Sequence, residues 1–255
     1  MLHGRVKLII NADDLGLSPQ VNEQILAALA DGTCTSASVL GNAPATRSLA
    51  GQLGRFPAVS FGVHLNLTEF APLTAVPLLQ PLLGDGLLCA RSLEVTRGQA
   101  DSVYDEWCAQ VLAVRDLGVR LSHLDSHQHV HYHPVLFRVL KRVQARFGIA
   151  RVRGMASWRL GGGARALAQI VRAGRFARAI RMDTPESVST DGFGSVRVFR
   201  ELLEAGLLHG DSFEIMCHPG NPHDTVAYEA EMAWLRSDWR ADRPALTLHS
   251  WWGVP

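Results

Sequence analysis

The chain has 255 residues, 47% hydrophobic and 19% charged, the composition of an ordinary globular protein with a substantial core. A net charge of +1 gives no electrostatic reason to expect binding to nucleic acid or to an anionic membrane. The four cysteines are widely spaced, which excludes a C-x-x-C zinc knuckle and predicts reduced thiols in a cytoplasmic protein. The N-terminus is unlike a signal peptide, and no segment is long and apolar enough to span a membrane.

Strand-like and helix-like segments alternate from the start of the chain. A helix is predicted to begin at Ser18-Pro19, with Ser as the cap and Pro at the first helical position, and to end at Gly32. A long loop is predicted at 72–86, rich in Pro, Leu and Gly. The other elements predicted in this part are strands at 6–11, 36–40, 59–65 and 121–125 and helices at 43–53, 100–117 and 134–147.

The alternation continues to the end of the chain. Three glycines at 161–163 break the chain before a basic helix at 164–181, whose arginines are expected to form a solvated face. The other predicted elements are strands at 151–154, 187–189, 212–217 and 245–248 and helices at 195–205 and 225–236. Without a clear linker or repeat, this alternation predicts a single domain with a parallel sheet covered by helices.

Two acidic residues, Asp13 and Asp14, stand side by side at the end of the first apolar run. Two adjacent carboxylates repel each other, so each must be hydrated, paired or bound to a metal. A division of labour would explain the pair, with one carboxylate binding a cation and the other handling protons. The alternative is a helix N-terminus, because Asp is a good cap and Gly16 a good turn residue.

Histidines later in the chain supply further candidate metal ligands. His64 lies in another short apolar run, and the densest cluster begins at 123 with His123, Asp125 and His127 at alternate positions. An extended segment would turn these three side chains to one face. Asp with two His is a familiar composition of an open metal site, although a His-rich tract can also bind metal adventitiously at a surface.

The positions of the polar residues separate a barrel from an open sheet. Those that fall just past the C-terminal ends of predicted strands are Asp13, Asp14, His64, Asp125, His127 and His218. The strand ends of a (β/α) barrel converge on one mouth, where active sites lie, whereas an open sheet would spread them along an edge. We therefore expect a single-domain α/β (β/α) barrel-like fold, irregular or with fewer than eight strands.

Five motifs together resemble the YdjC-like carbohydrate deacetylases, the family that includes the chitooligosaccharide deacetylases. In chain order they are NADDLGLS at 11–18, TSAS at 35–38, GVHLNLT at 62–68, HLDSHQHVH at 123–131 and MCHPG at 216–220. The departures are small: Leu15 stands where Phe is common in the family, and Gln128 where some members have another His.

The resemblance implies a barrel-like domain over 1–255 that removes acetyl from an N-acetylated sugar with one divalent metal ion. Position by position, the metal ligands of the family fall on Asp14, His64 and His127, and its catalytic base falls on Asp13. The metal would be zinc or magnesium: one carboxylate with two imidazoles suits zinc, and magnesium would need oxygen from water. One branch of the family is associated with hopanoid lipid biosynthesis, so the substrate could be a free sugar or a glycolipid. The sequence does not determine the oligomeric state, and the protein could form a homo-oligomer.

Four further residues are candidates for supporting roles. His218, on a separate strand end, is the candidate acid for the leaving nitrogen, or else a turn residue before Pro219. Asp125 is expected to orient a ligand histidine through its outer nitrogen, or to serve as a cap or salt-bridge partner. Arg153 could hold Asp13 ionised, or form an ordinary ion pair. His129 could contact the sugar or remain solvated.

Two alternative functions remain at this point. A metal-dependent phosphoesterase also uses His and Asp clusters at a barrel mouth, but the clustered acids are too few for an obvious second metal, and the motifs lack Lys. A noncatalytic sugar-binding protein would have no use for a base beside its metal ligand. Three tryptophans, Trp158, Trp251 and Trp252, could stack on a sugar, but core packing is the commoner role of Trp.

Overall fold

The computed structural model describes residues 5–75, 77–89, 95–155, 176, 178 and 186–254. Its main sheet is entirely parallel, with the strand order β7-β6-β3-β2-β1-β9-β8 and with β10 paired to the start of β1. The strands are β1 (Val6–Leu15), β2 (Ser36–Val39), β3 (Ser60–Leu65), β6 (Leu121–Ser126), β7 (Arg151–Val152), β8 (Gly192–Ser195), β9 (Ser212–Cys217) and β10 (Leu246–Leu248).

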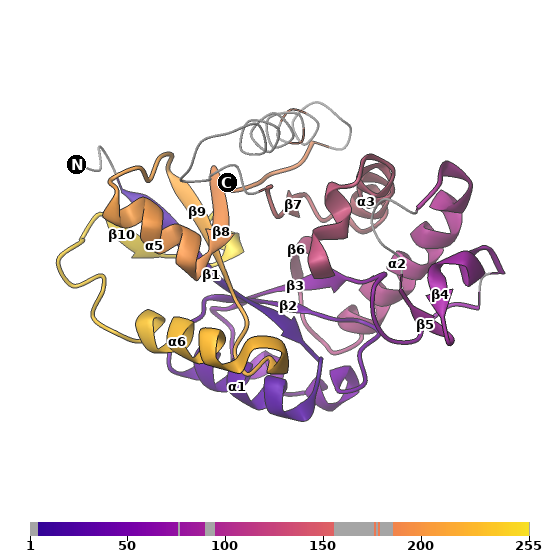
Figure 1. Cartoon of the computed structure of the whole chain (residues 1–255), viewed down its shortest axis with the longest axis horizontal. Helices are drawn as coiled ribbons and strands as arrows, with labels where there is room; N and C mark the ends of the chain where they lie inside the picture. The colour runs from indigo at the N-terminus through magenta and orange to yellow at the C-terminus, as the bar shows by residue number, and fades with distance from the viewer. Residues whose placement is uncertain are drawn as a thin grey trace.

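The sheet curves into an irregular half-barrel flanked by helices, which confirms the predicted fold class (Figure 1). Beside α1, the helix α6 packs on one side of the sheet, while α2 and α3 cover the strands β3 and β6. The helices are α1 (Pro19–Ala30), α2 (Ala100–Arg115), α3 (Pro134–Phe147), α5 (Val196–Glu204) and α6 (Thr225–Leu235). In the described part of the chain, no helix combines the length and apolarity needed to cross a bilayer.

The predicted helix at 43–53 is wrong. The chain instead forms two 3-10 turns, Thr46–Leu49 and Leu53–Arg55, separated by Gly51 with φ of 72°. A residue in this left-handed region cannot continue a right-handed helix, and glycine adopts it at little cost.

The predicted loop at 72–86 contains some regular structure. A 3-10 turn at Pro77–Leu82 leads into a small antiparallel hairpin of β4 (Leu83–Gly84) and β5 (Leu87–Leu88). Its turn residues Asp85 and Gly86 both have positive φ, as a tight two-residue hairpin turn requires.

Sequence patterns did not predict β8, because it is short and contains two glycines. A Cβ on Gly192 would lie 2.3 Å from the ring of Phe213, so the absence of a side chain is what lets β8 approach β9. The weak strand predicted at 187–189 is reduced to one parallel bridge between Arg151 and Val188. Of the predicted helix at 164–181, only Phe176 and Arg178 are described, both helical; the rest, the glycines at 161–163 and Trp158 lie outside the described residues.

Candidate active site

The C-terminal strand ends bring the predicted site residues together. Those lining one depression of about 330 Å³ are Asp13, Asp14, His64, His127, His129 and His218. Asp125, near the end of β6, and Arg153, directly after β7, are fully buried and contact these residues from within the sheet. The structure therefore places these residues together at the C-terminal ends of the strands.

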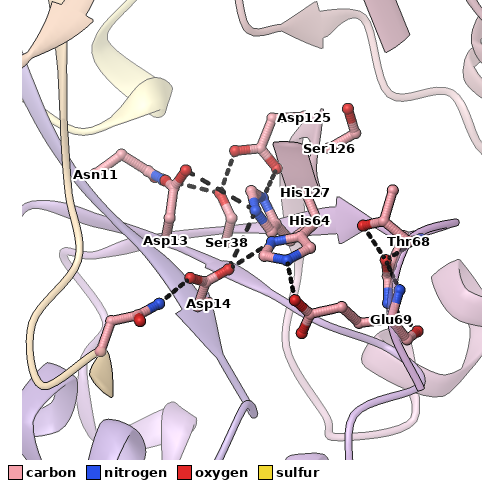
Figure 2. A network of polar contacts seen from close by, with 12 residues as sticks. Asn11, Asp13, Asp14, Ser38, His64, Thr68, Glu69, Asp125, Ser126 and His127 are labelled. Atoms are coloured by element: carbon pink, nitrogen blue, oxygen red, sulfur yellow. Dashed lines mark hydrogen bonds and ion pairs between the residues drawn. The ribbon is translucent and has the colours of Figure 1, made fainter. Parts of the chain in front are cut away.

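An irregularity in β1 directs both neighbouring carboxylates to this depression. Successive side chains of a regular strand point to opposite faces. Here the pairing of β1 with β2 shifts register between Ala12 and Leu15, and Asp14 has φ of 69°. Such a bulge re-aims side chains, and Figure 2 shows Asp13 and Asp14 close together beside His64. The alternative reading of the pair as a helix cap is wrong, since Ser18 caps α1 by accepting a hydrogen bond from Val21 N.

One carboxylate oxygen of Asp14 faces two imidazole rings. Asp14 Oδ1 lies 2.9 Å from His127 Nδ1 and 3.4 Å from His64 Nε2, and the other oxygen accepts a hydrogen bond of 2.8 Å from Asn221 Nδ2. Asp14 Oδ1 is buried and has no hydrogen-bond partner of good geometry in the described structure. Buried polar atoms normally have partners, so an unpartnered carboxylate oxygen facing two imidazole nitrogens fits a metal site. The ligand atoms of the three residues lie within 4.8 Å of one another.

Each of these histidines has a second carboxylate at its other nitrogen. His64 Nδ1 lies 2.8 Å from Asp125 Oδ1, and His127 Nε2 lies 3.4 Å from Glu69 Oε1 (Figure 2). Carboxylates in this position commonly fix the ring orientation of metal-binding histidines. The backbone of Glu69 is held in turn by Asn66, which accepts a hydrogen bond from its N–H and donates one to its carbonyl.

The site favours positive charge at the imidazoles. Burial alone would lower the pKa of His127, but Asp14 and Glu69 outweigh burial and raise it to about 10. Burial likewise opposes protonation of His64, yet the carboxylates of Asp125, Asp13 and Asp14 raise its pKa. In turn, His127 and His64 hold the pKa of Asp14 below its usual range, although burial alone would raise it. The depression is thus built to hold a cation.

A fully buried guanidinium organises the acids on the inner side of the depression. Arg153 donates to both oxygens of Asp13, at 2.6 and 2.7 Å, to Glu214 at 2.8 Å, and lies 2.9 Å from Asp125 Oδ2. Burial alone would raise the pKa of Asp13 and of Asp125, but Arg153 holds both below the usual range. For Glu214 burial prevails over Arg153 and raises the pKa to about 7.

The two oxygens of Asp13 differ in their environment. Oδ1 accepts hydrogen bonds from Asn11 Nδ2 and from Arg153 Nη2, which use both of its lone-pair sites. Oδ2 accepts one hydrogen bond, from Arg153 Nη1, and lies 3.9 Å from His64 Nε2. The atom with remaining acceptor capacity is therefore the one nearer the candidate metal ligands.

His218 follows the end of β9, which lies on the other side of β1 from β2 and β3. Its ring lies against that of Tyr228 on α6, with centroids 4.9 Å apart. Burial lowers the pKa of His218, although Asp13 and Asp14 counteract it. His129 stacks on Tyr132 at 5.3 Å, and burial lowers its pKa to about 3, so it is a neutral part of the wall.

The alternating pattern from His123 to His127 only partly describes this site. His127 lies after β6, in a 3-10 turn, and reaches Asp14 from there. His123 lies deeper within the barrel, stacked on Trp251 and beside Ser38 Oγ at 3.2 Å, and is not part of the depression. Trp251 is fully buried and thus serves as core.

Several residues of the site were missed from the sequence. Glu69 directly follows the GVHLNLT motif and Asn221 directly follows MCHPG, so continuing each motif by one residue would have found them. Nothing in the local sequence marks Glu214 as a site residue. It stands in an apolar strand, and the residue that binds it, Arg153, is 61 residues away in the sequence.

A family model and two relatives match most of the chain. The family model described as YdjC-like protein matches residues 7–246. A carbohydrate deacetylase of Halalkalibacterium halodurans is 32% identical over 217 residues, covering 84% of this chain and 85% of the relative. A carbohydrate deacetylase of Geobacillus stearothermophilus is 31% identical over 220 residues, covering 83% of this chain and 78% of the relative.

Among solved structures, the fold is similar to that of a protein of Enterococcus faecalis V583 described as a candidate cellobiose-phosphate cleavage protein. The TM-score is 0.71 at 23% identity, over 97% of this chain and 98% of the other. The overall fold is therefore shared over nearly the full length of both chains.

Proposed function

The chain belongs to the YdjC-like family, and on this premise we propose that it is a metal-dependent carbohydrate deacetylase that hydrolyses the N-acetyl amide of an amino sugar. The observation that carries the proposal is the convergence of Asp14, His64 and His127, with the carboxylate of Asp13 beside them. The carbohydrate deacetylases among its relatives support this choice of reaction.

Asp14, His64 and His127 would hold one divalent cation, zinc or magnesium. Such an ion supplies a Lewis acid that polarises the acyl oxygen and lowers the pKa of water. Asp125 and Glu69 orient the two imidazoles from their outer nitrogens.

Asp13 acts as the general base. Arg153 and Asn11 fix its carboxylate and keep it ionised, and Oδ2 keeps the capacity to accept a proton from the attacking water. The lowered pKa of Asp13 makes it a weak base. The proton transfer would therefore also require the bound cation to lower the pKa of the water.

His218 acts as the general acid for the departing nitrogen. It lines the depression from the end of β9, across β1 from the strand that carries His64, and Tyr228 packs against its ring. His129 also lines the depression, and its neutral ring can donate one hydrogen bond to a sugar and accept another.

The wall of the depression argues against a phosphate ester as the substrate. Among the described residues that line it there is no Lys or Arg, and the nearby Arg153 is already paired with acids. A noncatalytic sugar-binding protein would not need Asp13 to keep an open acceptor next to the cation site.

The test is acetate release by purified protein from N-acetylglucosamine oligomers and from an N-acetylated glycolipid, measured beside phosphate release from a generic ester. Activity should disappear after chelation and return with zinc or magnesium, and the substrate arms would identify a free or lipid-linked sugar. Phosphate release without acetate release would contradict the proposal and identify the protein as a phosphoesterase. Sugar binding with no release of either product would indicate a noncatalytic binder.

A further inference from the structure

A second depression, of about 550 Å³, lies at the opposite end of the sheet from the candidate active site. Its lining includes Leu121 and Arg151, the first residues of β6 and β7, whereas Asp125 and Arg153 lie at the other ends of these strands. At 3.3 Å per residue, the distance along β6 from Leu121 to His127 is about 20 Å. A ligand here would leave the candidate active site open.

Basic side chains dominate this second depression. We call it the arginine pocket and define it by Arg115, Arg120, Arg146, Arg151 and Trp252, which line it together with backbone and apolar groups. Its described lining contains no Asp or Glu, and none of the four arginines forms an ion pair with a described carboxylate.

Helix termini explain only part of this charge. Arg115 lies in the last turn of α2 and Arg146 in the last turn of α3, where a cation is favourable. Each helix end carries about half a negative charge, so two ends offset about one of the four positive charges. The whole chain has a net charge of only +1, so the surplus is local to this face.

Two of the guanidinium groups lie over the same indole ring. Arg120 is 4.3 Å and Arg151 5.6 Å from the centroid of Trp252. Arg151 is fixed further by donating from Nε and Nη2 to the carbonyl of Val254, at 3.2 and 3.0 Å. Stacking holds a guanidinium by its face and leaves the N–H groups in its plane available to an anion.

We propose that the arginine pocket binds a phosphate group, carried either by a soluble phosphate ester or by a phospholipid headgroup. The planar guanidinium fork matches the oxygens of phosphate and forms charge-assisted hydrogen bonds with them. The pocket has the size of ordinary small-molecule sites. This site is independent of the proposed deacetylase reaction, so either could fail without the other.

Binding can be tested on the full chain with two kinds of probe. Titration calorimetry with inorganic phosphate and glycerol 3-phosphate tests soluble ligands, and co-sedimentation with phosphatidylcholine vesicles, with or without phosphatidic acid, tests a headgroup. Arg120→Glu should weaken binding by about 10- to 100-fold, the value of a hydrogen bond to a charged group. Arg55→Glu makes the same charge change at an exposed residue outside the pocket and should change binding less than about twofold.

Because Arg120 packs on Trp252, Arg115→Gln provides a second variant outside the stacked pair, with Arg55→Gln as its control. Saturable binding of glycerol 3-phosphate would identify a soluble ester, and binding only to vesicles with phosphatidic acid would identify a headgroup. Absence of binding to every probe, or equal losses in the pocket and control variants, would overturn the proposal.

Discussion

Arg153 and Asp13 are separated by 140 residues and meet through two hydrogen bonds of 2.6 and 2.7 Å, both side chains being buried. The same guanidinium lies 2.9 Å from Asp125, which in turn contacts His64. One arginine thus connects the proposed base with the carboxylate behind a proposed metal ligand. Removing one partner of such a buried cluster would leave charge uncompensated, so the arrangement is held as a unit.

Replacing Asp13 tests the role of the base. Asp13→Asn should retain metal and lower turnover by about a hundred- to ten-thousand-fold, the usual contribution of a general base. Metal content and acetate release are to be measured together, with Asp116→Asn as an exposed control. Turnover near that of the wild type would show that Asp13 is not the base.

The metal site is tested by truncating its ligands. His64→Ala, like alanine at Asp14 or His127, should lose bound metal and acetate release together, because each supplies one of three converging ligand atoms. Elemental analysis after gel filtration measures the metal, and His209→Ala, at an exposed histidine, is the control. An alanine variant that keeps full metal content and activity would rule out its residue as a ligand.

Glu69 should act through His127. Glu69→Gln should weaken metal affinity by about 10- to 100-fold, as is common when the partner of a metal-binding histidine is lost. Activity should therefore recover at high metal concentration, which a merely structural defect would not allow. Titration of chelated protein with metal measures the affinity, and an unchanged curve would show that the 3.4 Å contact with His127 is incidental.

His218 can be assigned by changing the leaving group. His218→Gln should keep metal and product binding but slow amide cleavage strongly, and slow an activated ester much less, since a good leaving group needs little protonation. Equal losses on amide and ester would mean that His218 positions substrate or stabilises the acyl oxygen. Loss on neither substrate would leave it as a turn residue before Pro219.

Glu214 should make folding stability depend on pH. Burial raises its pKa from 4.5 to about 7, so the folded state binds the proton more tightly than the unfolded chain between these values. The free energy of unfolding should therefore fall as the pH rises through this range, by about 1.4 kcal/mol per pH unit from this group. Glu214→Gln should flatten that decline in urea unfolding of metal-free protein, whereas Glu204→Gln, at an exposed residue, should not. Parallel curves for wild type and Glu214→Gln would contradict the assignment.

Local patterns were enough to locate most of the regular structure and of the site. Alternating strand and helix signals predicted a parallel sheet, and polar residues at strand ends predicted one mouth, which brings together Asp14, His64 and His127. Both signals depend only on neighbours in the chain and on the rule that parallel strands end at the same edge. The local pattern gave a wrong prediction at 43–53. The spacing of apolar residues there is typical of a helix, but Gly51 interrupts the helical backbone.

What the sequence by itself determined is therefore which residues carry the chemistry and at which strand ends they stand. Only the tertiary structure decided how they meet: the bulge that directs both Asp13 and Asp14 to one side, and the buried Arg153 that binds Glu214 as well as Asp13. The arginine pocket also depends on the tertiary structure, since Trp252 contacts Arg120 although the two residues are far apart in the sequence. Such contacts depend on sheet order and packing between distant segments, and a periodicity of two or 3.6 residues contains no information about them.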